Sequence, residues 1–100
     1  MYKFKESKTA IKDWDNLKSM TKAVKAKFRF MFEEILENPR TLNAVGSPEQ
    51  LKHQKYETYS RELDKKDRIV FEIRSGAEFD MPEEEEIVVF LQYLGHYTDK

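Results

Sequence analysis

The apolar side chains in the first half of the chain recur with the period of an α-helix, and no other pattern limits the fold as strongly. Four of them are separated by four, three and four positions: Val24, Phe28, Met31 and Ile35. This spacing places them on one helical face. Thr21 is a typical N-cap for this helix, and Asn38-Pro39 ends it. The sequence therefore predicts an amphipathic helix that packs on another apolar layer.

The second half of the chain changes to the alternating pattern of β-strands. Two such runs, 56–63 and 68–74, flank the polar turn 64–67, and a more apolar run covers 87–94. Within 68–74 the odd-numbered apolar residues are expected on one face of the sheet and Arg68 on the other. The helices are expected to cover the apolar face.

Three further segments complete the expected order of elements. Residues 2–5 are expected to form a short strand, and residues 8–17 a first helix that begins at Ser7. The segment 75–86 is expected to be an exposed acidic loop. This order predicts an α+β fold, with a short N-terminal strand and two helices packed on one face of a mainly antiparallel four-stranded sheet. The 100 residues are expected to form a single domain, 1–100, whose other sheet face is free to carry a site.

The net charge hides an uneven distribution along the chain. Lys and Arg total 18 against 19 Asp and Glu, a net charge of -1, which implies no overall attraction to nucleic acid or membranes. Residues 1–32, however, hold nine basic and three acidic side chains, a local charge of +6. Four of the basic residues share one side if the two helices are continuous: Lys18, Lys22, Lys25 and Arg29. Attraction to a polyanion is therefore limited to a patch, and a solvated helix face is the simpler interpretation.

The residue inventory excludes several classes of chemistry. The chain has no Cys, so disulfide bridges, thiolate metal sites and cysteine nucleophiles are impossible within it. His53 and His96 are far apart and lack the spacing of a metal-ligand set, so no metal or cofactor is expected. No apolar run approaches the ~18 residues that span a bilayer, and a cytoplasmic protein without membrane contact is expected.

Acid–base chemistry remains, with Glu49, His53, Arg68 and His96 as candidates. Each also has a purely structural interpretation. Glu49 follows a proline and suits an exposed turn, whereas Arg68 suits a surface ion pair with Asp67 or Asp64. A lone histidine such as His96 usually has no catalytic role. Taken singly, none of these residues identifies a function.

The order of short motifs along the second half of the chain is more specific. Four motifs follow one another: Pro48-Glu49-Gln50-Leu51-Lys52-His53, Tyr59-Ser60-Arg61, Asp67-Arg68-Ile69-Val70-Phe71 and Tyr93-Leu94-Gly95-His96-Tyr97. In content and order they resemble the motifs of the YoeB (Txe) toxins, a RelE-like family from bacterial toxin–antitoxin modules. The first half of the chain is similar to this family in element order and helix character.

The resemblance implies a RelE/YoeB-like fold and a function. Members of the family are ribosome-dependent mRNA endonucleases, or mRNA interferases, which cleave mRNA in the ribosomal A site, inhibit translation and are neutralised by a YefM-like antitoxin. Family members can also dimerise, so a homodimer is a further expectation. By position in the motifs, Glu49 corresponds to the general base, Arg68 to the residue that stabilises the phosphate, and His96 to the general acid.

Other motif positions imply RNA contacts. Lys52, His53 and Arg61 match charged residues that surround the scissile phosphate in the family, and Tyr97 matches its terminal tyrosine. Tyr59 and Tyr97 offer rings on which splayed bases can stack, and packing at the sheet edge is the alternative for both. These five residues are the expected RNA-binding set.

The three assigned catalytic residue types suit metal-independent RNA cleavage. The 2′-hydroxyl attacks the neighbouring phosphate, so a base must remove its proton and an acid must protonate the departing 5′-oxygen. Ordinary pKa values of ~4.3 for Glu and ~6.5 for His allow both roles near neutral pH and predict a bell-shaped pH dependence. A planar guanidinium can hold two oxygens of the pentavalent phosphate.

Two other functions remain open at this point. The same fold serves ParE-type toxins, which inhibit gyrase and do not cut RNA, although that class lacks the acid–base set. A catalytically weakened homologue that still binds an antitoxin is the second alternative. It is motivated by Glu62 and Asp67, which are acidic where the family often carries basic or imidazole side chains. The long acidic loop and the residues after Tyr97 also depart from the family pattern.

Overall fold

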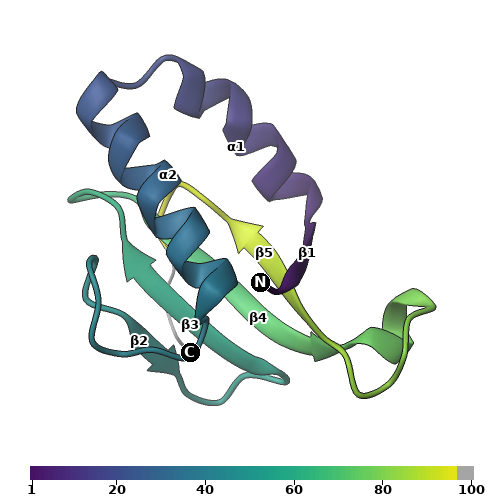
Figure 1. The fold of residues 1–100 in the computed structure, drawn as a ribbon. Helices are drawn as coiled ribbons and strands as arrows, with labels where there is room; N and C mark the ends of the chain where they lie inside the picture. Colours follow the sequence, from purple (N-terminus) through teal and green to yellow (C-terminus); the bar gives the residue numbers. More distant parts are fainter. Residues whose placement is uncertain (97–100) are drawn as a thin grey trace.

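Two helices cover one face of a five-stranded sheet in the computed structural model, which describes residues 1–96 (Figure 1). The elements follow in the order β1 (Lys3–Glu6), α1 (Lys8–Lys18), α2 (Lys22–Glu37), β2 (Glu49–Leu51), β3 (Glu57–Glu62), β4 (Arg68–Ser75), the 3-10 helix η1 (Gly76–Phe79) and β5 (Glu86–Gln92). The strand order is β1-β5-β4-β3-β2; β1 runs parallel to β5, and the other neighbours are antiparallel. The predicted α+β class is confirmed.

The sheet has one strand more than the four expected. The additional strand is β2, which pairs with β3 at the edge of the sheet. Its three residues are too few to show the alternation that identifies a strand in a sequence. The predicted strand count was therefore wrong, and the correction matters because β2 carries Glu49.

Side-chain caps determine where both helices begin. The Ser7 hydroxyl accepts a hydrogen bond from the N–H of Ala10 at 3.1 Å, and the Thr21 hydroxyl accepts one from Val24 at 3.2 Å. The Ser7 hydroxyl also donates to the carbonyl of Leu91 at 2.7 Å, which ties the start of α1 to β5. Both helices lie where the sequence predicts them.

The two helices are separate, as the sequence predicts, and the four basic residues therefore do not share one side of a continuous helix. Residues 19–21 lie between the helices, and Lys18 ends α1 while the other basic residues of the stripe lie on α2. Lys18 and Lys25 nevertheless meet across the helix hairpin, where the Lys25 ammonium donates to the Lys18 carbonyl at 3.4 Å. The basic patch therefore belongs to the helix layer and not to the open face of the sheet.

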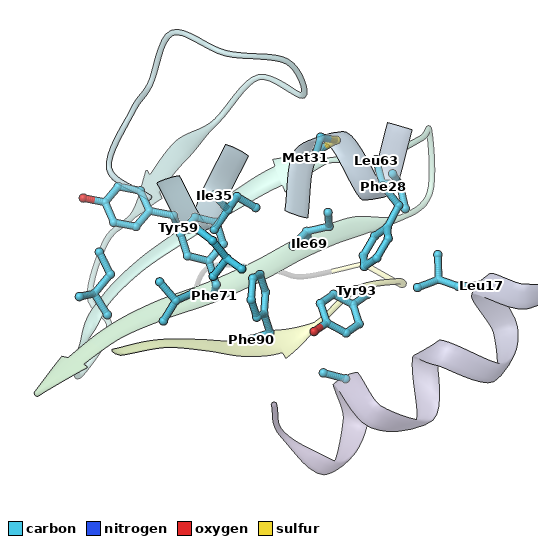
Figure 2. Close-up of a cluster of buried hydrophobic side chains, with 14 residues drawn as sticks. Leu17, Phe28, Met31, Ile35, Tyr59, Leu63, Ile69, Phe71, Phe90 and Tyr93 are labelled. Carbon is cyan, nitrogen blue, oxygen red and sulfur yellow. The ribbon is translucent and has the colours of Figure 1, made fainter. Parts of the chain in front are cut away.

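The predicted apolar face of α2 lies at the centre of the core. Phe28, Met31 and Ile35 are buried against the sheet (Figure 2). The sheet and the turn after β5 contribute Tyr59, Ile69, Phe71, Ile73, Val88, Phe90 and Tyr93. The odd-numbered residues of β4 thus face the helices, as strand alternation predicts.

A buried arginine lies beneath α2. The Arg61 side chain is 1% exposed, pairs with Glu34, and donates to the Val45 carbonyl from Nε at 2.9 Å and from Nη2 at 2.6 Å. Its Nη1 has no hydrogen-bond partner among the described residues. The guanidinium is enclosed on the helix-covered side of the sheet, so it has no surface for RNA. The expected RNA contact of Arg61 is corrected to a structural role.

Tyr59 lies on the same covered side. It is 4% exposed, its ring stacks on Phe71 with centroids 5.6 Å apart, and its hydroxyl donates to Glu57 at 2.5 Å. Burial raises the pKa of Tyr59 to about 12. The packing alternative therefore holds for Tyr59, and its expected role as a stacking surface for RNA is corrected.

Arg40 joins the loop after α2 to two strands that are not neighbours. Its guanidinium pairs with Glu57 of β3 at 2.7 Å and with Glu86 of β5 at 2.7 Å. Hydrogen bonds from Arg40 lower the pKa of both carboxyl groups. These pairs hold the loop after α2 to the two strands that flank the central strand β4.

The acidic segment 75–86 projects from the sheet, as predicted (Figure 1). It contains η1, and Asp80, Glu83 and Glu84 are exposed. Among residues 1–96, the helices are too short and too polar to cross a membrane.

We expect Glu34→Ala to lower the free energy of unfolding by about 3 kcal/mol, because it leaves the buried Arg61 guanidinium without its counter-charge. Denaturation in urea measures the change. The matched control is Glu33→Ala, which removes the exposed neighbour on the same helix and should change stability by less than about 0.5 kcal/mol. Equal effects of the two substitutions would contradict the structural role of the pair.

We expect Arg40→Met to destabilise the protein more at about pH 7 than at about pH 3. Arg40 depresses the pKa of Glu57 and Glu86 in the folded state, so the pairs stabilise the fold above the ordinary carboxyl pKa of 4.5. This contribution is lost as the pH falls further, through the depressed pKa values, and the carboxyl groups become protonated. Denaturation of both proteins at each pH measures it; an equal difference at both pH values would disprove the linkage.

Candidate active site

Strand register brings Glu49 and Arg68 together on the face of the sheet that the helices leave open. Glu49 of β2 is opposite Ser60 of β3, and Glu62 of β3 is opposite Arg68 of β4. The Arg68 guanidinium donates to the Ser60 hydroxyl from Nε at 3.2 Å and from Nη2 at 2.9 Å. Its Nη2 lies 3.4 Å from Glu49 Oε1. Three strands therefore position one cation beside one exposed carboxylate.

Ser60 is a site residue to which sequence reasoning gave no role. Its side chain is 1% exposed and lies beneath the Arg68 guanidinium, which it orients through two hydrogen bonds. The Arg68 side chain itself is 24% exposed. The guanidinium is thus fixed from below and open to solvent from above, which suits a group that receives an anion.

A second carboxylate flanks Arg68. Glu62 Oε2 lies 3.9 Å from Arg68 Nη1, and the Glu62 side chain is 51% exposed. The sequence marks Glu62 as a departure from the family pattern, and the register shows the consequence: Arg68 lies between two carboxylates, Glu49 and Glu62.

His96 is exposed and follows a turn that is bonded to the start of β4. The backbone N–H of Arg68 donates to the Gly95 carbonyl at 3.0 Å. Since His96 is the next residue after Gly95, the structure brings all three predicted catalytic residues to the same end of β4. Tyr97, the expected neighbour of His96 in RNA binding, lies outside the described residues.

Lys52 and His53 are exposed but lie away from Arg68. They follow β2 and line a hollow together with Tyr56 and Glu57, whereas Arg68 is paired with the opposite end of β3. His53 has a φ of 61°, in the left-handed region. The structure therefore does not bring these two residues to the Arg68 guanidinium.

Asp67 joins the site from the turn before β4. The carboxylate accepts a hydrogen bond from the backbone N–H of Gly95 at 2.7 Å. Burial raises the pKa of Asp67, while the Lys66 backbone N–H lowers the pKa of Asp64 in the same turn. Within residues 1–96 no cluster of three or more His, Cys, Asp or Glu side chains could hold a metal ion. The groups gathered at this end of β4 are carboxylates, a guanidinium and an imidazole.

Solved structures of toxins share this fold. A YoeB/ParE toxin from Agrobacterium tumefaciens is 18% identical and aligns over 95% of this chain and 99% of its own, with a TM-score of 0.73. The YoeB dimer from Staphylococcus aureus is 21% identical over 96% of this chain and 98% of its own, with a TM-score of 0.67. A heterotetrameric YoeB–YefM toxin–antitoxin complex from Staphylococcus aureus gives the same identity and TM-score over 97% and 99%.

At these identities the likeness supports the fold alone, and no curated protein sequence matches the chain. A family model provides the assignment. The model of the YoeB-like toxin of bacterial type II toxin–antitoxin systems matches residues 6–97, nearly the whole chain, and the protein therefore belongs to this family.

Proposed function

We propose that this protein is a metal-independent endoribonuclease toxin that cleaves mRNA in the ribosomal A site and is neutralised by a YefM-like antitoxin. The observation that carries the proposal is the Arg68 guanidinium, held by Ser60 beside the exposed Glu49 carboxylate. Membership of the YoeB-like family and the YoeB–YefM complex of a relative support the toxin class and its partner.

The chemistry follows from three groups at one end of β4. Glu49 removes the proton of the 2′-hydroxyl, whose oxygen forms a bond to the adjacent phosphorus. Arg68 stabilises the charge that accumulates on the phosphate oxygens. The bond from phosphorus to the 5′-oxygen breaks as His96 protonates that oxygen, which leaves a 2′,3′-cyclic phosphate and a 5′-hydroxyl. Because Arg68 Nη2 and Glu49 Oε1 are 3.4 Å apart, the contact between these two side chains is weak and an incoming phosphate can replace it.

The exposed residues after β2 receive a different role from the one first expected. Lys52 and His53 are exposed after β2, near the start of β3, whereas Arg68 pairs with the end of β3. We assign them to contacts with nucleotides beside the cleaved one. Tyr97 keeps its predicted RNA contact. The ribosome is the expected second partner. A homodimer is also expected, because the YoeB structure from Staphylococcus aureus is a dimer.

Cleavage of mRNA on programmed ribosomes tests the function. We expect Glu49→Gln, Arg68→Ala and His96→Gln each to lower the cleavage rate by about 10² to 10⁴-fold. Glu84→Gln is the control for a lost carboxylate, because Glu84 is exposed on the acidic loop; it should cleave as the wild type does. Unchanged cleavage by all three site variants would disprove the assignment of Glu49, Arg68 and His96 as catalytic residues.

Expression in bacteria that lack an antitoxin separates the alternatives. Growth arrest with cleaved mRNA is the expected result. Growth arrest with intact mRNA and gyrase-dependent DNA breaks would show a ParE-like toxin instead. Normal growth with soluble, folded protein would show a weakened homologue.

We expect Glu62→Gln to strengthen RNA binding about twofold to fivefold, because its carboxylate competes with phosphate for the Arg68 guanidinium at the surface. The dependence of cleavage rate on the concentration of programmed ribosomes gives the affinity. Glu84→Gln makes the same change of charge far from Arg68 and should leave the affinity unchanged. Weaker binding by Glu62→Gln would indicate that Glu62 supports Arg68 and does not compete for it.

A further inference from the structure

The peptide groups around Gly95 form hydrogen bonds with Gln92 of β5 and with residues 67–68 at the start of β4. The Gly95 N–H donates to Asp67 Oδ1 at 2.7 Å, and its carbonyl accepts from the Arg68 N–H at 3.0 Å. The Gln92 carboxamide nitrogen lies 3.0 Å from the same carbonyl and 3.1 Å from the Arg68 carbonyl. The turn after β5 is therefore bonded to the first residues of β4.

The Asp67 carboxylate is itself fixed by the turn in which it lies. Asp64 Oδ1 accepts hydrogen bonds from the N–H groups of Lys66 and Asp67, both at 3.0 Å. The Leu63 N–H donates to the Asp67 carbonyl at 2.9 Å. These bonds close a tight turn between β3 and β4, so that the carboxylate projects from a rigid support.

Gly95 gives the turn a conformation that other residues rarely adopt. Its φ is +91°, in the left-handed region, and a Cβ at this position would meet its nearest neighbour, the Gln92 amide nitrogen, at an ordinary 3.9 Å. The constraint on Gly95 is thus conformational and not steric. A turn of this kind needs an external anchor to hold one orientation, and the Asp67 carboxylate is the side-chain anchor of the Gly95 N–H.

We propose that Asp67 is a positioning residue that holds the His96 turn against β4, so that His96 faces the phosphate bound by Arg68. The inference rests on the proposed function. Each of the two catalytic residues directly follows one of the two residues that this hydrogen bond joins: Arg68 follows Asp67, and His96 follows Gly95. This side-chain bond, together with the backbone bond from Arg68 to Gly95, therefore fixes the turn that carries the proposed proton donor relative to the proposed phosphate ligand.

The test compares Asp67→Ala with Asp67→Asn on programmed ribosomes. Asparagine keeps a carbonyl oxygen that can accept from the Gly95 N–H, whereas alanine keeps no acceptor. We expect Asp67→Ala to lower kcat by about 10²-fold while the half-saturating ribosome concentration stays unchanged, and Asp67→Asn to recover most of the rate. Lys65→Ala, an exposed substitution in the same turn, is the control and should act as the wild type. If Asp67→Ala does not fold, Asp67→Ser replaces it, because its shorter hydroxyl side chain does not reach Gly95.

Amide hydrogen exchange at Gly95, measured by NMR on the free protein, tests the anchoring without cleavage. Exchange should be about fivefold faster in Asp67→Ala than in the wild type and in Asp67→Asn, as expected for the loss of one hydrogen bond. Unchanged exchange at Gly95, or full cleavage by Asp67→Ala, would overturn the proposal. So would an equal loss of kcat in Asp67→Asn and Asp67→Ala. A wild type that does not cleave mRNA would overturn the proposed function, while the exchange rates would still decide whether Asp67 anchors the turn.

Discussion

Strand pleating gives the central strands β3 and β4 two different faces. One face packs in the core beneath the helices, and the other carries the candidate site. On β4 the odd-numbered residues pack beneath α2, while Arg68 projects to the other side. On β3 the same division places Tyr59 and Arg61 in the interior and Ser60 beside Arg68. Because side chains alternate at every residue, a shift of one position would bury Arg68 and expose Arg61. The pairing of the buried Arg61 with Glu34 depends on this register, and so does the packing of the apolar face of α2 on the sheet.

Two arginines share the open face, and their surroundings explain why only one is suited to a ligand. Arg74 pairs with Glu78 and Glu72, and its guanidinium lies 4.2 Å from the centre of the Tyr56 ring. These side chains of the same protein already occupy the Arg74 guanidinium, which is therefore less available to an external ligand. Within residues 1–96 the short hydrogen bonds of the Arg68 guanidinium go to Ser60 alone, and its contacts with Glu49 and Glu62 are 3.4 and 3.9 Å. The difference lies in the partners, since both arginines are equally exposed at 24%.

Helix positions, fold class and the face of Arg68 were predictable because each depends on local periodicity. The spacing of Phe28, Met31 and Ile35 predicts the buried face of α2, and the alternation after Arg68 predicts the buried face of β4. The edge strand at Glu49 was not predictable, because three residues carry no period. Tyr59 and Arg61 were misplaced for another reason: a motif match gives a position in the chain but not the side of the sheet. The side of the sheet is given by the strand register, which pairs Ser60 with Glu49 and Glu62 with Arg68. The register is known only from the structure.

The pairing of β1 with β5 has a consequence for the order in which the protein forms. The Ser7 hydroxyl and the Leu91 carbonyl that it contacts are separated by 84 positions, and β1 lies parallel to β5 over its whole length. Closing so long a loop is slow and entropically unfavourable until the segments between have folded. During synthesis the sheet cannot close before β5 has left the ribosome, although β2, β3 and β4 are already available. His96, the proposed proton donor, joins Glu49 and Arg68 last, so a nascent chain of this toxin carries the proposed catalytic residues only in part.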